Sequence, residues 1–174
     1  VPGVRVVGTG EEVGKPGVRG QFGSRVLVLE RGVRLEDYSW SDEDAPSIDA
    51  RLADRIEIIR GPASVLYGSD ALSGVVNVIP EPLPASGTGF HSSFEVYGAT
   101  NNHEAGSMLR GEGAGNGYGW RGTLLGRFAE AIHTPVGELE NTGFFSLNGD
   151  LAIGFNRDWG NATIRYARYG GEFK

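Results

Sequence analysis

The chain has 174 residues, which is long enough for a domain with a sizeable buried core. Its formal net charge of −6 argues against a nucleic-acid partner held through phosphate contacts, and the absence of cysteine excludes a thiolate metal site. Its 29 glycines suit tight turns and close backbone packing better than long helices. No run approaches the roughly 18 apolar residues of a transmembrane helix, which leaves open a membrane protein built from alternating strands.

The first third of the chain alternates short apolar runs with loops. Val4–Val7 predicts a short strand, and the Gly, Pro and charged residues of 11–17 predict a loop. Arg25–Glu30 then predicts an apolar strand that is closed by Gly32.

Residues 36–54 form the most acidic part of the chain. We expect a solvated loop here, followed by a short helix around Ile48–Ala53. A cation contact is the minor alternative. The pair Asp42 and Asp44 lacks the glycine and the later glutamate of an EF-hand loop, so calcium is not supported.

The segment from Arg55 to Ile79 is the most distinctive part of the sequence. Ile56–Ile59 predicts a β-branched strand, and Pro62 suits the first turn of a helix because its missing N–H is not needed there. Ala63–Tyr67 supplies about one more turn, Gly68 can adopt the positive φ that ends it, and Val75–Ile79 predicts a second strand. This is too compact for an ordinary βαβ crossover, which takes roughly 30 residues.

These motifs resemble the C-terminal half of the plug domain of TonB-dependent outer-membrane receptors. The matching residues are Arg55-Ile56-Glu57, Arg60-Gly61-Pro62-Ala63-Ser64, Tyr67-Gly68 and Gly74-Val75-Val76-Asn77-Val78-Ile79. Upstream, three more segments match the family in the same order: Pro16–Gly23, Val26–Leu29 and Gly32-Val33. One departure is visible, because Arg31-Gly32 stands where the family usually has Asp-Gly, so the contacts of that turn are in question.

The resemblance implies a receptor in the outer membrane of a Gram-negative bacterium that binds a scarce solute outside the cell. An iron–siderophore complex is the favoured cargo, with haem, cobalamin, zinc or a glycan as alternatives. The implied partners are TonB with its inner-membrane energising complex, the small-molecule or metal-chelate ligand and outer-membrane lipid. No covalent chemistry and no cofactor are implied. Because the family's signal peptide, TonB box and first part of the plug have no counterpart here, we expect this sequence to be a fragment.

A proline-rich segment, Glu81–Gly87, separates this region from a different pattern. We therefore predict a plug domain over residues 1–84, with its N-terminal part missing, and the first strands of a truncated barrel over residues 85–174.

Beyond the linker, apolar and polar residues alternate strictly through five segments. These segments are 88–99, 105–114, 120–128, 144–155 and 160–170. One apolar face, one charged face and strands of about 10 residues are typical of a transmembrane β-barrel with a wet lumen, although a soluble sandwich has the same period. Aromatic residues at one end of the predicted strands favour the membrane, because they would form an interfacial belt: Tyr118, Trp120, Phe155 and Trp159.

The predicted fold is thus a mixed α+β plug domain followed by antiparallel transmembrane β-barrel strands, an incomplete barrel with about five strands present. If the linker emerges on the periplasmic side, Gly115–Gly117 and Asn156–Asp158 are periplasmic turns, whereas Thr100–Glu104 and Ala131–Thr142 are extracellular loops. Five strands cannot close a barrel, which needs at least about eight.

Charged residues of the plug-like region are candidates for ion pairing. Arg19 and Arg60 each precede a glycine at the end of a buried-looking segment, where a lone charge would be costly. The resemblance implies that arginines at these two positions bridge to glutamates on the barrel wall. Arg55 and Glu57 lie on the same strand face and are expected to belong to the plug's own ion-pair network. The resemblance also marks structural motif residues at Gly20, Gly61, Pro62, Tyr67, Gly68 and Gly74.

The three histidines show no metal-ligand spacing, and no metal site is predicted. In the predicted topology, His103 and His133 lie in extracellular loops, with Glu138 and Glu140 nearby in sequence, and these four residues are the candidates for ligand contact. No nucleophile, base and orienting group can be assembled, and the G-x-G-x-x-G match at 117–122 lies at a hairpin, so an enzyme is not predicted. The competing class is a secreted or surface all-β binding or adhesion module.

Overall fold

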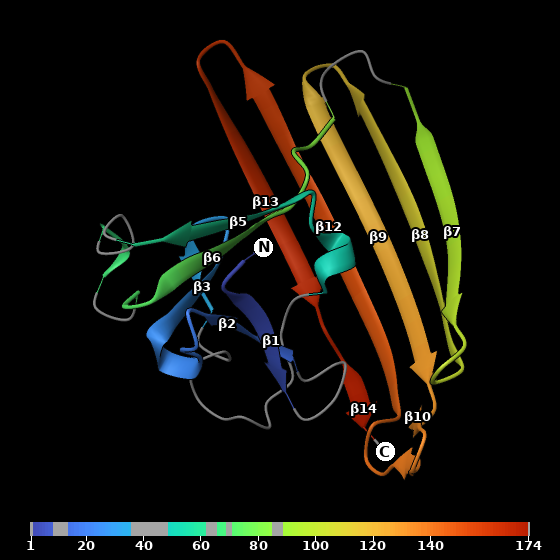
Figure 1. Ribbon diagram of the computed structural model, residues 1–174. Coiled ribbons are helices and arrows are strands. Elements are labelled where there is room, and N and C mark those ends of the chain that lie inside the picture. Colours follow the sequence, from blue (N-terminus) through green and yellow to red (C-terminus); the bar gives the residue numbers. More distant parts are fainter. Residues whose placement is uncertain are drawn as a thin grey trace. The chain divides into compact units, whose positions relative to one another are not determined.

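Strands make up nearly all of the regular structure in this computed structural model, which describes residues 2–8, 14–35, 49–61, 66–68, 71–84 and 89–173 (Figure 1). The chain divides into two units, Val1–Glu81 and Pro82–Lys174. None of the described residues belongs to a helix that is long and apolar enough to cross a membrane.

The first unit contains a four-stranded sheet with the order β4-β3-β6-β5. Its strands are β3 (Val26–Glu30), β4 (Val33–Arg34), β5 (Arg55–Arg60) and β6 (Gly74–Ile79). Strands β3 and β6 pair in parallel, and the other two pairings are antiparallel. A separate antiparallel hairpin is formed by β1 (Val4–Gly8) and β2 (Gly14–Val18). The strands predicted at Val4–Val7, Arg25–Glu30, Ile56–Ile59 and Val75–Ile79 are confirmed within one or two residues.

The two central strands of this sheet carry continuous apolar runs because both of their faces are buried. Leu27, Leu29, Ala71 and Val75 form one cluster, against which Ile59 packs. Val18, Val26 and Val76 form a second cluster with Ile58. At the start of β6 the packing is closest: a Cβ on Gly74 would lie 2.9 Å from the Ile59 carbonyl oxygen and 3.1 Å from Val18 Cγ1. Glycine is therefore the residue that lets β6 approach β5 at this point.

The structure differs from the sequence-based predictions of one loop and of the helices. Residues 14–17, expected in a loop, form most of β2, so that prediction was wrong. The helix expected around Ile48–Ala53 is represented by a single 3-10 turn, η2 (Ala50–Leu52), and a second 3-10 turn, η1 (Gly23–Arg25), precedes β3. The acidic residues 36–48 and the helix start at Pro62–Val65 lie outside the described residues. The described residues form no α-helix, and the α part of the α+β prediction stays unconfirmed.

The turn between β3 and β4 explains how the chain accommodates its departure from Asp-Gly. Glu30 pairs with Val33, and the two residues between them have positive φ, 52° at Arg31 and 81° at Gly32. This is the backbone of a type I′ hairpin turn, which favours Asn or Asp at its first central position. The turn is tied to β6, because the Arg31 N–H donates to the Val78 carbonyl at 2.9 Å and the Gly32 N–H to Asn77 Oδ1 at 3.1 Å. Arg31 is thus held in a left-handed conformation that its side chain disfavours.

The second unit is a long antiparallel sheet with the order β13-β12-β9-β8-β7 (Figure 1). Its strands are β7 (His91–Ala99), β8 (Glu104–Gly115), β9 (Tyr118–Ala129), β12 (Phe144–Arg157) and β13 (Gly160–Arg168), with β14 (Gly171–Phe173) continuing along β12. All five strands predicted from alternation are confirmed. The predicted loop Ala131–Thr142 contains a small hairpin of its own, β10 (Ile132–Thr134) and β11 (Gly137–Leu139).

Replacing Arg31 by Asn should stabilise the protein by roughly 1 kcal/mol, because Asn tolerates the left-handed conformation that costs an ordinary side chain about that much. Urea unfolding would measure the change, with Arg31→Ala as the control that removes the long side chain but gains no left-handed preference. Equal stability of the Asn and Ala variants would contradict this account of the turn.

Candidate functional site

The long sheet of the second unit has reversed polarity, because its apolar face is exposed and its polar face is buried. On β12, Leu151 and Ile153 are each 55% exposed, whereas Ser146 and Asn148 are each 5% exposed. A sheet of a water-soluble protein turns its apolar side chains inward and its polar ones toward solvent. The arrangement on β12 is the opposite.

Strand register extends the exposed apolar face across all five strands, since residues directly opposite one another share a face. The opposite face is buried mainly on β8, β9 and β12, whereas Ser93 and Glu95 on β7 are exposed. Leu109 pairs with Leu124, and Leu124 pairs with Gly149, so one row of the apolar face runs from β8 to β12. The large exposed side chains on this face are Phe90, Phe94, Val96, Leu109, Trp120, Leu124, Phe128, Phe145, Leu147, Leu151, Ile153, Ile164 and Tyr166. Such a large continuous apolar surface marks a contact with lipid or with another apolar partner.

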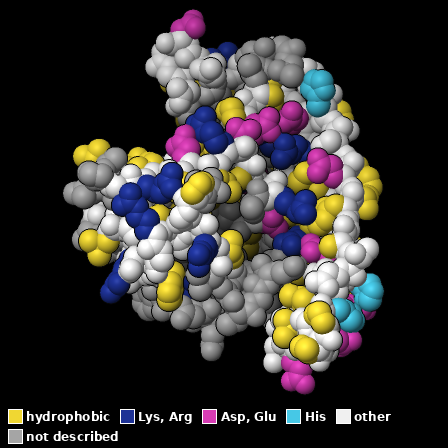
Figure 2. Space-filling model, in the orientation of Figure 1, with side chains coloured by type: hydrophobic (Ala, Val, Ile, Leu, Met, Phe, Trp, Pro, Cys, Tyr) yellow, Lys and Arg dark blue, Asp and Glu magenta, His cyan; other side chains and the backbone are white. Residues whose placement is uncertain are grey.

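The polar face is organised by arginine–carboxylate pairs that bridge neighbouring strands. Arg121 on β9 lies opposite Glu112 on β8, and its Nη2 is 2.6 Å from Glu112 Oε2. Arg127 Nη2 donates to Glu104 Oε1 at 2.8 Å. Glu104 is a diagonal neighbour, two residues before Gly106, which lies directly opposite Arg127. Figure 2 shows basic and acidic side chains interspersed over the long strands. The side chains of these pairs are mostly buried, so each charge is compensated by its partner.

A third pair and an aromatic contact complete the polar face. The Arg165 Nε donates to Asp150 Oδ2, joining β13 to β12. The Arg127 guanidinium also lies over the Phe144 ring, 4.9 Å from the ring centroid, which is within cation–π range. The charged groups of this face therefore hold four of the strands together in a fixed register.

Aromatic rings gather at the end of the sheet that carries the short turns. Phe90 and Trp120 stack with their centroids 6.0 Å apart, and Phe155 contacts both Tyr118 and Trp159, at 6.5 Å and 5.4 Å between ring centroids. Tyr118, Trp120, Phe155 and Trp159 are the residues expected in an interfacial belt, and Phe90 stacks on one of them. Amphipathic rings at one end of an apolar face are typical of proteins whose apolar band ends there at a membrane surface.

The loops at the opposite end bring together two of the predicted ligand-contact residues. The rings of His103 and His133 lie 5.4 Å apart, edge to face, and Figure 2 shows histidine side chains gathered at the lower end of the long sheet. His103 Nδ1 lies 2.7 Å from Glu130 Oε2, and His133 Nε2 lies 3.1 Å from Glu138 Oε1.

The outcome for this group is mixed. Glu138 joins it as expected, whereas Glu140 is exposed and no contact places it there. Glu130 was missed, because it lies 27 residues from His103 in sequence and only the pairing of β8 with β9 brings them together. Within the described residues, no group of three or more His, Asp or Glu side chains has an arrangement that could hold a metal ion.

The predicted ion-pairing residues of the first unit occupy different environments. Arg55 Nη2 lies 3.0 Å from Glu57 Oε1, an exposed pair on β5. Arg60 Nη1 donates to the Pro2 carbonyl oxygen at 2.6 Å, and Arg19 is exposed, with its backbone N–H bonded to the Gly3 carbonyl. The pairing of Arg19 and Arg60 with glutamates on a barrel wall stays a prediction.

The predicted structural motif depends mainly on backbone conformation. Three of its glycines have positive φ, 76° at Gly20, 87° at Gly61 and 108° at Gly68, which L side chains rarely adopt. The positive φ at Gly68 agrees with the prediction for that position, and the start of the helix that it was expected to end lies outside the described residues. Tyr67 is 45% exposed, and Pro62 lies outside the described residues.

Comparison with known proteins gives a family match for the first 75 residues and a shared fold for nearly the whole chain. Residues 1–75 match the family model described as the TonB-dependent Receptor Plug Domain, which confirms the resemblance drawn from the sequence motifs. Among solved structures, the copper transporter OprC has a TM-score of 0.83 at 23% identity, and the match covers 99% of this chain and 26% of that one.

Two siderophore receptors give similar results. A mutant of the ferric enterobactin receptor PfeA from Pseudomonas aeruginosa has a TM-score of 0.70 at 19% identity, covering 98% of this chain and 29% of that one. The siderophore receptor PirA from Acinetobacter baumannii has a TM-score of 0.69 at 20% identity, covering 98% and 28%. At these identities the likeness establishes the fold, and the chain spans less than a third of the length of each of these structures.

Breaking the pair between Glu112 and Arg121 should cost about 3 kcal/mol of unfolding free energy, because either single change removes the oppositely charged partner of a largely buried charge. Urea unfolding of Glu112→Gln and Arg121→Gln would measure it. The double exchange Glu112→Arg with Arg121→Glu should recover part of the loss.

The matched control is Glu57→Gln, which removes an exposed pair worth about 0–1 kcal/mol. If the loss at Glu112 were no larger than the loss at Glu57, the polar face would not depend on its ion pairs for stability.

Proposed function

We propose that this chain, whose first 75 residues match the TonB-dependent receptor plug domain, acts in an outer-membrane receptor that imports a scarce solute with energy from TonB and the proton-motive force. The observation that supports this proposal most strongly is the reversed polarity of the long sheet. A plug-type unit followed directly by a sheet with exposed leucines and buried ion pairs is suited to a solute pathway through a membrane.

The strands have the dimensions that a bilayer requires. Strands β8 and β9 have 12 residues each and β12 has 14, and a tilted membrane-spanning strand needs about 9–11. Antiparallel pairing satisfies the backbone hydrogen-bonding groups between neighbouring strands, which is required inside the hydrocarbon core of a bilayer. The exposed apolar face would contact lipid, and the ion-paired face would line an aqueous lumen.

The aromatic residues at one end of the sheet support one orientation of its strands in the membrane. With Tyr118, Phe155 and Trp159 at the periplasmic surface of the membrane, the short turns at Asn116-Gly117 and Asp158-Trp159 are periplasmic. The loop Thr100–Glu104 and the hairpin of β10 and β11 then face the outside. In this orientation His103 and His133 are positioned where an incoming solute first meets the protein.

The two parts of the chain have separate tasks in this proposal. Residues 1–84 act as the plug, and residues 85–174 form the first part of the barrel wall. Arg19 and Arg60 are exposed, and although Arg60 Nη1 donates to the Pro2 carbonyl oxygen, both residues would be accessible to acidic groups on a surrounding wall. A polar, hydrated interface of this kind can rearrange at modest cost when TonB acts on the plug.

We propose an iron–siderophore complex as the cargo. The family resemblance is the main support, together with the presence of siderophore receptors among the structures that share the fold. A metal cargo is the second candidate. It is favoured by the copper transporter that shares the fold and by the neighbouring histidines at the outer end of the sheet. Haem, cobalamin, zinc and glycans are distinguished from these by the uptake experiment below.

The competing class is a secreted binding module, in which the apolar face would pack on a second sheet. The described residues of the second unit form one long sheet and one small hairpin, and the apolar face of the long sheet stays exposed. The two classes differ in their need for lipid, which is measurable.

Substituting Arg for Leu151 should weaken folding into lipid vesicles by about 2–4 kcal/mol, because the side chain lies near the middle of the exposed apolar row on β12, away from the aromatic end. The matched control is Glu95→Arg, an exposed position on the polar face, which should change folding by much less. Urea titration in the presence of vesicles would measure both. A protein that folds equally well without vesicles and tolerates both changes would belong to the competing class.

Uptake tests the transport function directly. The full-length gene product, expressed in a Gram-negative host without its own siderophore receptors, should accumulate radioactive iron supplied as a siderophore complex only when TonB is functional. A panel of labelled haem, cobalamin, copper, zinc and glycan, each supplied separately, would identify the cargo. Equal uptake with and without TonB would contradict the proposal, as would a lack of accumulation of every solute in the panel.

A further inference from the structure

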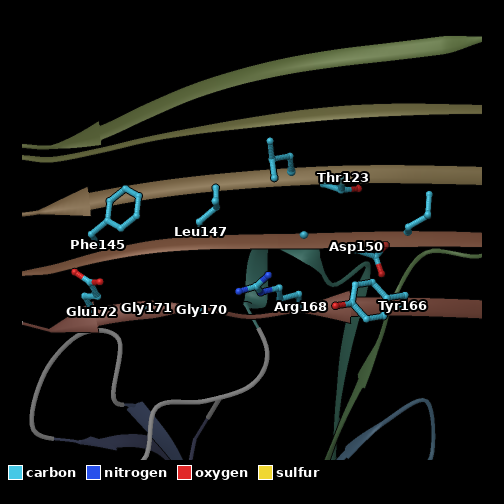
Figure 3. Close-up of a pocket in the computed structure, with 12 residues that line it drawn as sticks. Thr123, Phe145, Leu147, Asp150, Tyr166, Arg168, Gly170, Gly171 and Glu172 are labelled. Carbon is cyan, nitrogen blue, oxygen red and sulfur yellow. The ribbon is translucent and has the colours of Figure 1, made fainter.

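Glycines within the long strands leave space above the sheet, and the two faces of the sheet differ in what occupies that space. On the apolar face a hollow of about 620 Å³ opens around Gly149, and Leu147 and Tyr166 are among the residues that line it (Figure 3). On the polar face, Gly119 on β9 lies directly opposite Gly154 on β12. The space above this second pair is occupied by the linker, at the residues with which the second unit begins.

The contact between the linker and the two glycines is close. The Pro84 carbonyl oxygen lies 2.7 Å from the position that a Cβ would take on Gly119, and Leu83 Cβ lies 3.5 Å from the same position. Leu83 Cδ1 lies 3.0 Å from the Cβ position of Gly154. Real Cβ atoms essentially never approach another heavy atom within 3.0 Å. Glycine at these two positions therefore leaves the room that the linker fills.

Strand connectivity alone does not require the linker to lie here. Gly119 precedes Arg121 by two residues on β9, so it belongs to the polar face, and it follows closely on the short turn at Asn116-Gly117. Strand β7 begins at the same end of the sheet, because His91 pairs with Glu112. However, β8 lies between β7 and the two strands that the linker contacts. The linker thus crosses the polar face before the chain enters β7.

The chain also contacts β9 on its other face. Phe90 stacks on Trp120 with the ring centroids 6.0 Å apart, and Trp120 directly follows Gly119. Consecutive residues of a strand point to opposite faces of the sheet. The chain therefore contacts β9 on the polar face through Pro84 and on the apolar face through Phe90, and β9 lies between these two contacts.

We propose that Leu83 and Pro84, which we call the anchor, fix the linker to the sheet, so that movements of the first unit end at residue 82. Within the described residues, β7 pairs only with β8, and it begins shortly after the linker. A force on the free end of such an edge strand would separate its hydrogen bonds one after another. With the anchor in place, the force acts on the packed backbone at Gly119 and leaves the pairing of β7 intact. The role of the anchor rests on the proposed function, in which TonB acts on the plug.

The motion of a spin label next to the anchor tests the contact. These 174 residues contain no cysteine, so Pro82→Cys provides a single exposed attachment site in a full protein that is free of other cysteines. Electron paramagnetic resonance should show restricted motion of this label. Gly119→Ala should make the label several-fold more mobile, because the three atoms nearest to the new methyl group all belong to Leu83 and Pro84. Leu83→Ala should have a smaller effect in the same direction.

The matched control is Gly122→Ala on the same strand, where the nearest contact of the new methyl group is Leu151 Cδ1 at an ordinary 3.7 Å. This variant should leave the label restricted. Urea unfolding adds a difference in sign, because alanine in a strand is otherwise more stable than glycine. The unfolding midpoint should fall for Gly119→Ala and should stay equal or rise for Gly122→Ala. Equal label motion and equal midpoints in the two variants would overturn the anchor.

A label in the first unit separates the anchor from the proposed function. Val33→Cys places it at an exposed position beside the turn between β3 and β4. When solute and TonB are added, the motion at residue 33 should change while the label at residue 82 stays restricted. Mobility at residue 82 in the otherwise unaltered protein, or a gain in mobility there on addition of TonB, would overturn the anchor. A restricted label at residue 82 with no response at residue 33 would support the anchor and contradict the proposed function.

Discussion

The cross-strand pairing of arginines with carboxylates is the interaction on which the long sheet depends. On the central strands of this sheet the face opposite the exposed leucines is largely buried, and that face carries charges. An uncompensated charge there would cost several kcal/mol, whereas Glu112 with Arg121 and Glu104 with Arg127 compensate each other at hydrogen-bond distance. The polar face can therefore be enclosed while remaining suitable for water and solutes. The apolar face is then left for a nonpolar surrounding, which is the basis of the membrane assignment.

The register that makes these pairs is encoded in one short turn. Asn116 and Gly117 both have positive φ, 52° and 78°, and Gly115 pairs with Tyr118 across them, as in a two-residue type I′ hairpin. Once that turn is fixed, every pairing of β8 with β9 follows, and Glu112 must face Arg121. A shift by one residue would place the charged side chains of the shifted strand on the apolar face. The ion pairs were accessible from the sequence through the Asn-Gly dipeptide, although alternation alone did not reveal them.

Alternation predicted all five long strands because their two faces differ so strongly in polarity that the period of two is unmistakable. The same signal failed where strands are short or interrupted. Strand β2 contains Pro16 as well as Gly14 and Gly17, a composition that is typical of a loop. In the structure, however, Pro16 pairs with Val6 in a two-stranded hairpin. Contacts that depend on distant segments were also beyond the sequence. Glu130 reaches His103 only through the pairing of β8 with β9, and the Arg60 guanidinium reaches the Pro2 carbonyl across 58 residues.

The abundance of glycine has a second explanation besides turns. Within the strands, several glycines lie directly opposite a large side chain that leans over them. Leu151 Cδ1 is 3.7 Å from the Cβ position of Gly122, and Leu147 Cδ1 is 3.9 Å from that of Gly126. On the polar face the Tyr97 ring occupies the space above Gly106, where a Cβ would lie 2.2 Å from the ring. Large residues thus shield the exposed backbone of their glycine partners, a device that stabilises glycine within a sheet. Gly149 is approached in the same way, with Leu124 Cδ1 3.9 Å from its Cβ position, so leucines and glycines alternate as partners across the apolar face.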